Sequence, residues 1–234
     1  MKKQASSIEP ARQRGLSKKE SLADSIYANL RSAIIRGELA PKTRLAQIDI
    51  ANQMGSSQAP VREALQRLEL DGLVERYPHG GHYVSDISID EMYQIFSIRC
   101  NIECFAVQRV ARIITSSQCE ELIGRVEQMT QAAHDDDLVL LVEHDMQFHK
   151  MICEWSGCKA LVRAWTPLYS QVQRFDVQSH PRYFDDLFAN AMSHMQIVDV
   201  LRNGHPEEAV ATIKTHIMAI WSKIELNGDF TLLR

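Results

Sequence analysis

Four side chains of metal-ligating type stand on helical stripes that are otherwise apolar in the second half of the chain. Asp145 and His149 are four residues apart, so on a helix both point to the face that carries the apolar residues of their segment. His194 and His216 each lie within the apolar stripe of a separate segment with helical spacing. A buried carboxylate without a partner is costly, so these groups require one another or a ligand.

Three imidazoles and one carboxylate that converge from three helices suit a divalent metal ion. Zinc is the ion we expect, with nickel and manganese as alternatives. The competing interpretation is that each histidine is simply hydrogen-bonded in the core. A single buried histidine favours that interpretation, whereas four polar residues on three core stripes favour a metal.

Arg99 is a second polar residue on an apolar stripe. A guanidinium held near a core requires an anionic partner that can pair with its two-pronged edge. One candidate partner is Glu103, one helical turn further on. We expect instead that Arg99 and the metal together bind the carboxylate of a small organic acid, which makes Arg99 an effector-binding residue.

Helices must position these residues, and the chain after Ser88 has helical spacing throughout, without a strand pattern or an internal repeat. The expected breaks contain acidic residues, glycine or proline, as at His180-Pro181. The helices are expected near residues 90–113, 117–132, 138–155, 159–178, 184–203 and 207–226. The fold class is therefore mainly α, and this half is an antiparallel helical bundle.

The first third of the chain has the pattern of a winged helix-turn-helix. Helical spacing predicts one helix between Ser21 and Gly37, a second over 47–54 and a third over 57–71, with a turn at Gly55. Two short alternating segments around residues 78–81 predict a hairpin. In such a domain the third helix enters the major groove of DNA.

Six residues are candidate DNA contacts. Ser57, Gln58 and Arg62 stand at the start of the third helix, the part that reaches base edges. Gln58 can bind adenine through two hydrogen bonds, and Arg62 can bind guanine or a phosphate. The residues expected to contact the DNA backbone are Arg44, Arg67 and His79. The alternative is that these are ordinary polar surface residues.

The charge distribution agrees with DNA binding through one end of the chain. The first 78 residues carry 13 Lys and Arg against 9 Asp and Glu, and the rest carry 13 against 21, within a net charge of −4. No apolar run is long enough to span a membrane, and the N-terminus lacks the apolar core of a secretory signal. Five cysteines, an odd number, indicate reduced thiols and a cytoplasmic protein.

Four segments follow from these patterns. They are a basic tail over 1–19, the winged helix-turn-helix over 20–87, the helical effector- and metal-binding domain over 88–228, and a short tail over 229–234.

The segment MGSSQAPVREALQRLELDGLVERYPHGGHYV, residues 54–84, resembles the N-terminal domain of the GntR family of bacterial regulators. This chain has Gln58 where the family commonly has arginine, a difference that bears on which operator is bound and not on DNA binding itself. The residues that carry the match are Gly55, Ser57, Pro60, Val61, Arg62, Glu63, Ala64, Leu65, Leu68, Gly72, Leu73, Val74, Gly81 and Val84.

The second half resembles the helical ligand-binding domain, called FCD, of the FadR subgroup of that family. The segments that carry this resemblance are IRCNIECFAV, HDMQFHKMI, SHMQIVDVLRNG and ATIKTHIMAIW. In many members the aspartate and the three histidines at these positions hold a metal inside the bundle. The resemblance therefore implies the same role for Asp145, His149, His194 and His216.

Together these observations predict a homodimeric transcription regulator that binds a palindromic double-stranded DNA operator and responds to a small organic acid. No role at a membrane and no catalytic residues are expected. Three alternatives stay open: a metal-dependent hydrolase built on the bundle, a regulator whose metal is purely structural, and a regulator whose effector is an acyl thioester.

Overall fold

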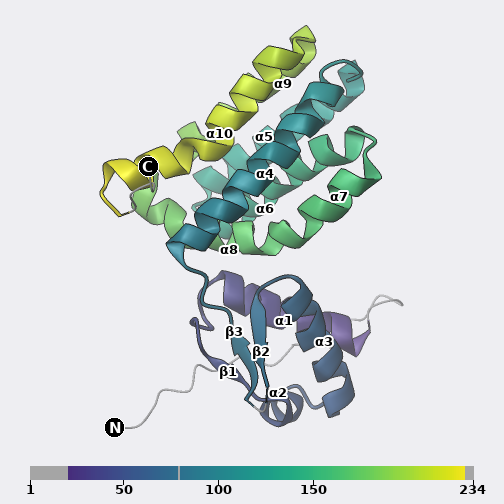
Figure 1. Ribbon diagram of the computed structural model, residues 1–234, viewed down its shortest axis with the longest axis vertical. Helices are drawn as coiled ribbons and strands as arrows, with labels where there is room; N and C mark the ends of the chain where they lie inside the picture. The colour runs from purple at the N-terminus through teal and green to yellow at the C-terminus, as the bar shows by residue number, and fades with distance from the viewer. Residues whose placement is uncertain (1–20, 79, 230–234) are drawn as a thin grey trace. The chain divides into compact units, whose positions relative to one another are not determined.

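The computed structural model describes residues 21–78 and 80–229 (Figure 1). The chain divides into two compact units, of which the first ends at Asp86 and the second begins at Ile87. The expected tail over 1–19, all but the first residue of the expected tail over 229–234, and His79 lie outside the described residues. Within the described part, no helix is long and apolar enough to cross a membrane.

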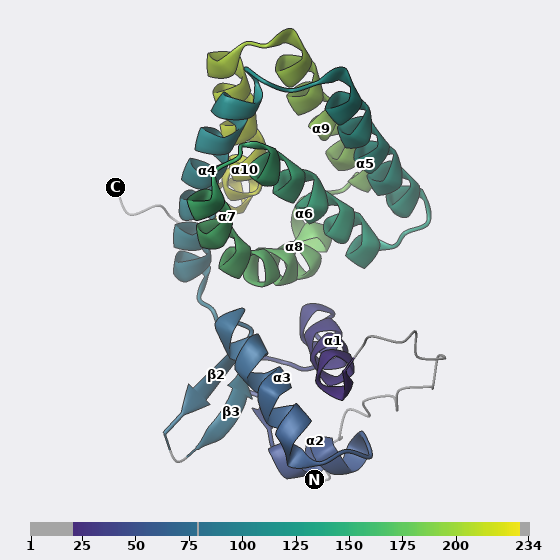
Figure 2. The ribbon, with the colours of Figure 1, turned by 90° about the vertical axis from the view of Figure 1, so that its right-hand side faces the viewer.

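The first unit contains three helices and a small antiparallel sheet. Figure 2 shows its three helices beside the hairpin of β2 and β3. The strand order is β1-β3-β2, with Arg44 opposite Tyr83 and Tyr77 opposite Gly81. In chain order the elements are α1 (Leu22–Ile35), β1 (Arg44–Leu45), α2 (Gln47–Gln53), α3 (Gln58–Leu70), β2 (Val74–Tyr77) and β3 (Gly81–Val84). The predicted winged helix-turn-helix is confirmed.

Local sequence signals explain where these helices begin and end. The Ser21 hydroxyl accepts a hydrogen bond from the Asp24 backbone N–H, and the Ser21 backbone N–H donates to the Asp24 carboxylate, so α1 begins with a capping box. Ser57 occupies the cap position of α3 but its side chain makes no capping hydrogen bond. Gly55 has φ of 60°, a left-handed conformation that suits glycine in the tight turn between α2 and α3.

The second unit is a helical bundle, as expected. Helix α4 packs mainly against α10, and α5 packs against α6 and α9. In chain order its elements are α4 (Ile89–Val110), α5 (Ser116–His134), α6 (Leu138–Trp155), α7 (Lys159–Trp165), the short 3-10 helix η1 (Thr166–Leu168), α8 (Tyr169–Tyr183), α9 (Leu187–Asn203) and α10 (Pro206–Leu226).

Two local expectations were wrong, and one short strand was not predicted. The helix expected over 159–178 is divided into α7, η1 and α8 at Pro167, which lacks the backbone N–H that a continuous helix requires. The break expected at His180-Pro181 does not occur, because Pro181 lies in the last turn of α8, near the helix end at Tyr183. Strand β1 was not predicted, since two residues are too few to show alternation.

Candidate metal centre and nucleic-acid interface

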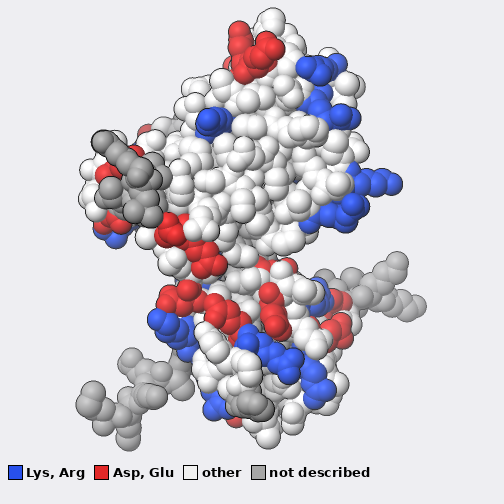
Figure 3. All heavy atoms as spheres, in the orientation of Figure 1, with Lys and Arg blue, Asp and Glu red and all other residues white. Residues whose placement is uncertain are grey.

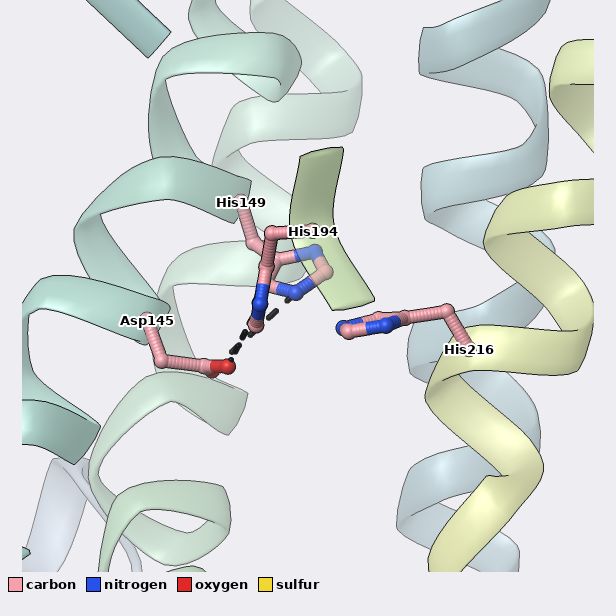
Figure 4. A group of neighbouring side chains, drawn as sticks. All are labelled: Asp145, His149, His194 and His216. Carbon is pink, nitrogen blue, oxygen red and sulfur yellow. Dashed lines mark ion pairs between the residues drawn. The ribbon is translucent and has the colours of Figure 1, made fainter. Parts of the chain in front are cut away.

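The four predicted metal ligands come together inside the helical bundle (Figure 4). Asp145 and His149 project from α6, His194 from α9 and His216 from α10. Each offers one ligand atom, and these atoms all lie within 4.8 Å of one another. Helical spacing placed each residue on a core stripe, and the packing of the three helices brings their three stripes together.

Asp145 is at the centre of this group. Its Oδ1 lies 2.8 Å from Nε2 of His194, and its Oδ2 lies 4.0 Å from Nε2 of His149. The ring centroids of His194 and His216 are 4.2 Å apart, and those of His149 and His216 are 5.3 Å apart. The carboxylate and the imidazoles therefore face a shared small volume.

The ring of His149 is oriented by Glu103 on α4. Nδ1 of His149 lies 2.5 Å from Oε2 of Glu103, and both side chains are fully buried. Oε1 of the same carboxylate accepts hydrogen bonds from Nε of Arg99 at 2.7 Å and from the indole N–H of Trp165 at 2.9 Å. A carboxylate on the far ring nitrogen is the usual support of a metal-binding histidine.

The other two rings are held in the same way, through Nδ1. In His194 this nitrogen lies 3.0 Å from the carbonyl oxygen of Ala191. In His216 it lies 3.3 Å from the hydroxyl of Ser193, which itself donates to the carbonyl of Asn190 and is thus free to accept. Because each Nδ1 is engaged, each Nε2 is the atom available for a metal.

The unsatisfied atoms of the site fit a metal ion. Nε2 of His149 and Nε2 of His194 are buried and have no hydrogen-bond partner among the described residues. With Nδ1 of His194 donating to a carbonyl, the neutral ring carries a lone pair on Nε2 that faces the Asp145 carboxylate. Two acceptors in contact repel each other unless a cation or a proton lies between them. Three imidazole nitrogens and one carboxylate oxygen form a donor set that zinc accepts.

The pKa shifts of two ligands, Asp145 and His216, favour the protonation states that bind metal. Burial by itself raises the pKa of Asp145, but His194, His149 and Arg99 outweigh that effect and lower it, so the group is a carboxylate. Burial, together with the two neighbouring imidazoles, holds the pKa of His216 well below its usual value, so this ring is neutral at pH 7. Metal binding requires a deprotonated carboxyl group and neutral imidazoles.

A cavity of about 410 Å³ adjoins the centre, and three of the four ligands, Asp145, His149 and His216, line it together with Arg99 and Lys223. This volume lies in the range of small-molecule sites. A purely structural metal site is usually closed on all sides by protein ligands, whereas an accessible side permits a further ligand. The geometry therefore allows a small molecule to approach the metal position.

Arg99 pairs with Glu103, the alternative partner that the sequence offers. Its Nε donates to Glu103, and its Nη1 lies 4.0 Å from Asp176, beyond hydrogen-bond distance. The pKa of Glu103 is lowered to about 2, because His149 and Arg99 outweigh the effect of burial. Since Arg99 also lines the cavity, the salt bridge leaves the outer edge of the guanidinium available to a ligand.

Sequence reasoning missed two cavity residues on α8. Asp176 and His180 are both buried and both line the cavity. Their spacing of four residues, the same as that of Asp145 and His149, was a usable signal. The sequence predicts a helix break at Pro181, and such a break would leave His180 outside any helix face, which hides this spacing.

The candidate DNA-reading residues at the start of α3 are on the surface. Ser57, Gln58 and Arg62 are exposed, as is Arg44 on β1. Arg67 is only partly exposed, and its contacts are within the domain: Nη1 lies 2.6 Å from Asp24, and the guanidinium lies over the ring of Tyr27. His79 lies outside the described residues. The contacts of all six residues with DNA stay predictions.

Comparisons with known proteins match both halves of the chain. The family model described as "Bacterial regulatory proteins, gntR family" matches residues 22–84, and the FCD domain model matches residues 94–219. The HTH-type transcriptional repressor RspR of Escherichia coli is 29% identical over 83% of this chain and 85% of its own length. The probable D-xylose utilization operon transcriptional repressor of Paenarthrobacter nicotinovorans is 31% identical over 80% of this chain and 81% of its own length.

Solved structures show the same fold at lower identity. McbR/YncC of E. coli superposes with a TM-score of 0.75 at 20% identity, over 90% of this chain and all of that chain. A putative transcriptional regulator GntR from Rhodococcus gives a TM-score of 0.73 at 21% identity, over 91% of this chain and all of that chain.

The metal centre predicts how ligand variants behave. Purified protein should bind about one zinc ion per chain, and His194→Ala should lose stoichiometric binding because one of four ligands is removed. Ser193→Ala, which removes only the partner of the His216 ring, should lower affinity about 10- to 100-fold. Metal analysis after dialysis and competition with a chelating dye measure both effects. His134→Ala, at a histidine whose side chain is 82% exposed, is the control. Full retention of zinc by His194→Ala would contradict the assignment.

Proposed function

The chain belongs to the gntR family of bacterial regulatory proteins and carries an FCD domain, and from this membership we propose that it is a dimeric, ligand-responsive regulator of the FadR subgroup. It is a DNA-binding transcriptional regulator and not an enzyme, so the hydrolase alternative is set aside. In this proposal the bundle holds a divalent metal, zinc first, and a small carboxylate binds beside it. The unsatisfied Nε2 atoms next to a cavity lined by Arg99 are the observation that carries it.

The exposed start of α3 supports direct reading of an operator. Gln58 is the first residue of α3, and Arg62 follows one turn later on the exposed side of the helix. The N-terminal turns of a recognition helix are those that reach base edges. Gln58 pairs with adenine in this proposal, and Arg62 pairs with guanine or a phosphate.

The carboxylate effector follows from the positive charges at the cavity. A metal with three imidazole ligands and one carboxylate keeps a net positive charge, and Arg99 and Lys223 line the same cavity. An acid bound there bridges the metal and the free edge of Arg99. It alters operator binding to the extent that it prefers one conformation of the dimer over another. Coupling of the usual size changes operator affinity roughly 5- to 150-fold.

The outward face of α4 is proposed to contact the second copy of the chain. Between Glu91 and Arg109 its exposed residues are all uncharged, and Ile98 and Phe105 are each 52% exposed. Figure 3 shows no charged side chain over the middle of this helix. A solvent-facing helix usually presents charged and polar side chains. A second copy is the occupant that reading a palindrome requires, since a two-fold dimer presents one recognition helix to each half-site.

The DNA-binding proposal predicts the effect of Arg62→Ala. An operator selected from a random library by the wild-type protein should bind this variant about 5- to 150-fold more weakly, as expected for loss of one base or phosphate contact. Wild-type binding should also weaken steeply with salt, because each neutralised phosphate adds about −0.9 to the log–log slope. Lys150→Ala removes one positive charge from the exposed side of α6, in the helical bundle, and should leave operator binding unchanged. Salt-independent binding would contradict the proposal.

The effector proposal predicts a response that depends on Arg99. A panel of small carboxylic acids is added to the metal-loaded protein on its selected operator, and at least one acid should change operator affinity. Arg99→Lys keeps the charge beside Glu103 but loses the two-pronged edge, so it should lose the response while keeping operator affinity without acid. If no acid acts and chelation only unfolds the bundle, the metal is structural.

The dimer proposal predicts that Phe105→Asp separates the copies. An aspartate in each copy brings like charges into the contact, so self-association should weaken by about 100-fold or more. Sedimentation and light scattering measure the mass. Phe188→Asp, at a phenylalanine of α9 that is 54% exposed, is the matched control. A dimer that survives Phe105→Asp but not Phe188→Asp would place the contact on α9.

A further inference from the structure

The wall of the cavity formed by α8 presents hydrogen-bond acceptors. Asp176 and His180 are 5% and 7% exposed, and both line the cavity. Because they are four residues apart on one helix, they lie on the same side of α8. Neither is a predicted metal ligand, and neither has a role in the site described above.

The carboxyl group of Asp176, whose side chain is 8% exposed at the cavity, has no hydrogen-bond partner among the described residues. Its nearest cation is Nη1 of Arg99 at 4.0 Å, and its side chain forms no hydrogen bond with any residue that the structure describes. Leaving a buried carboxyl group unsatisfied is costly, and such groups in native proteins are nearly always paired. The carboxyl group of Asp176 therefore points to a ligand in the cavity.

His180 adds a second acceptor one turn away. Its Nδ1 lies 2.7 Å from the backbone carbonyl oxygen of Asp176, to which it donates. Burial lowers the pKa of His180, so the ring is neutral and Nε2 carries a lone pair. Stacking on Phe184, with centroids 4.7 Å apart, holds the plane of the ring.

The acceptors of α8 and the cations of the same cavity select different parts of one ligand. Arg99, Lys223 and the metal position attract a carboxylate. A second carboxylate fits α8 poorly, because it would place acceptors against the Nε2 atom of His180. An ammonium group would share the cavity with those three cations.

A hydroxyl group satisfies this wall in either protonation state. It donates to the lone pair of His180, and it pairs with Asp176 whether that residue is a carboxylate or a neutral acid, since a hydroxyl both donates and accepts. Burial raises the pKa of Asp176, which further disfavours an ammonium partner. Asp185 and Asp186 also line the cavity, but both are exposed to water and Asp186 caps α9.

We propose that the ligand of this cavity is a polyhydroxylated carboxylic acid, whose hydroxyl groups bind Asp176 and His180 while its carboxylate binds the metal and Arg99. This inference rests on the proposed function, because it names the chemical class of the effector. Asp176 is then the residue that separates hydroxylated acids from plain fatty acids and dicarboxylates of equal length.

Titration calorimetry on the zinc-loaded full-length protein tests this with acids of equal chain length. The probes are gluconate and its epimers galactonate and mannonate, compared with hexanoate, adipate and 6-aminohexanoate. At least one of the hydroxylated acids should bind about tenfold or more tightly than the other three, because a hydroxyl group donates to the acceptors of α8 without adding a positive charge beside Arg99 and Lys223. Metal analysis after each titration verifies that zinc stays bound.

Variants separate this inference from the proposed function. Asp176→Leu should reduce the preference for the hydroxylated acid over hexanoate to about onefold, while Asp176→Asn should keep part of it. The control Asp199→Asn, at an exposed aspartate of α9 that does not line the cavity, should keep all of it. If hexanoate or adipate binds the wild type as tightly as any hydroxylated acid, or 6-aminohexanoate binds most tightly, the inference is overturned and the effector proposal stands. If the protein binds zinc but no acid, both are overturned.

Discussion

A single buried carboxylate, that of Glu103, joins the polar groups on which the second unit depends. One of its oxygens binds the ring of His149, and the other accepts from Arg99 and Trp165. The negative charge compensates the buried guanidinium and also fixes the plane and tautomer of a metal-ligating imidazole. Glu103 therefore links the orientation of a candidate metal ligand, His149, to the charge of a cavity residue, Arg99. A substitution that moves either side chain is expected to alter the other through this carboxylate.

Helix α4, which carries Arg99 and Glu103, is the first helix of the second unit in sequence. The second unit begins at Ile87 and α4 at Ile89, so α4 directly follows the winged helix-turn-helix in sequence. The same helix carries Arg99 and Glu103 on its buried side and an uncharged face on its outer side. In the proposed function, a ligand held by Arg99 acts on the helix that we assign to the contact between copies, which would give effector binding a short physical route to the geometry of a dimer.

The character of the cavity bears on the remaining alternatives. A metal that only stabilises a fold needs no adjoining space, yet the candidate metal site adjoins a cavity of about 410 Å³ with buried charged groups in its wall. Arg99, Asp176 and Lys223 make that wall polar, and a polar wall is poorly suited to the hydrocarbon chain of an acyl thioester. A small, hydrophilic acid agrees with both the size and the chemistry.

Sequence alone determined the two-part architecture and the four candidate metal ligands, because local periodicity places these residues on the buried faces of helices. Apolar spacing shows which face of a helix is buried, and a polar residue on such a face is visible without coordinates. Only the tertiary structure decided that Arg99 pairs with Glu103, that Asp176 and His180 line the same cavity as the candidate metal ligands, and that Arg67 is held by Asp24. These relations depend on which helices pack together and on whether Pro181 ends a helix. Local spacing makes the pairs within a helix possible, but only the packing of the whole domain decides which contacts form.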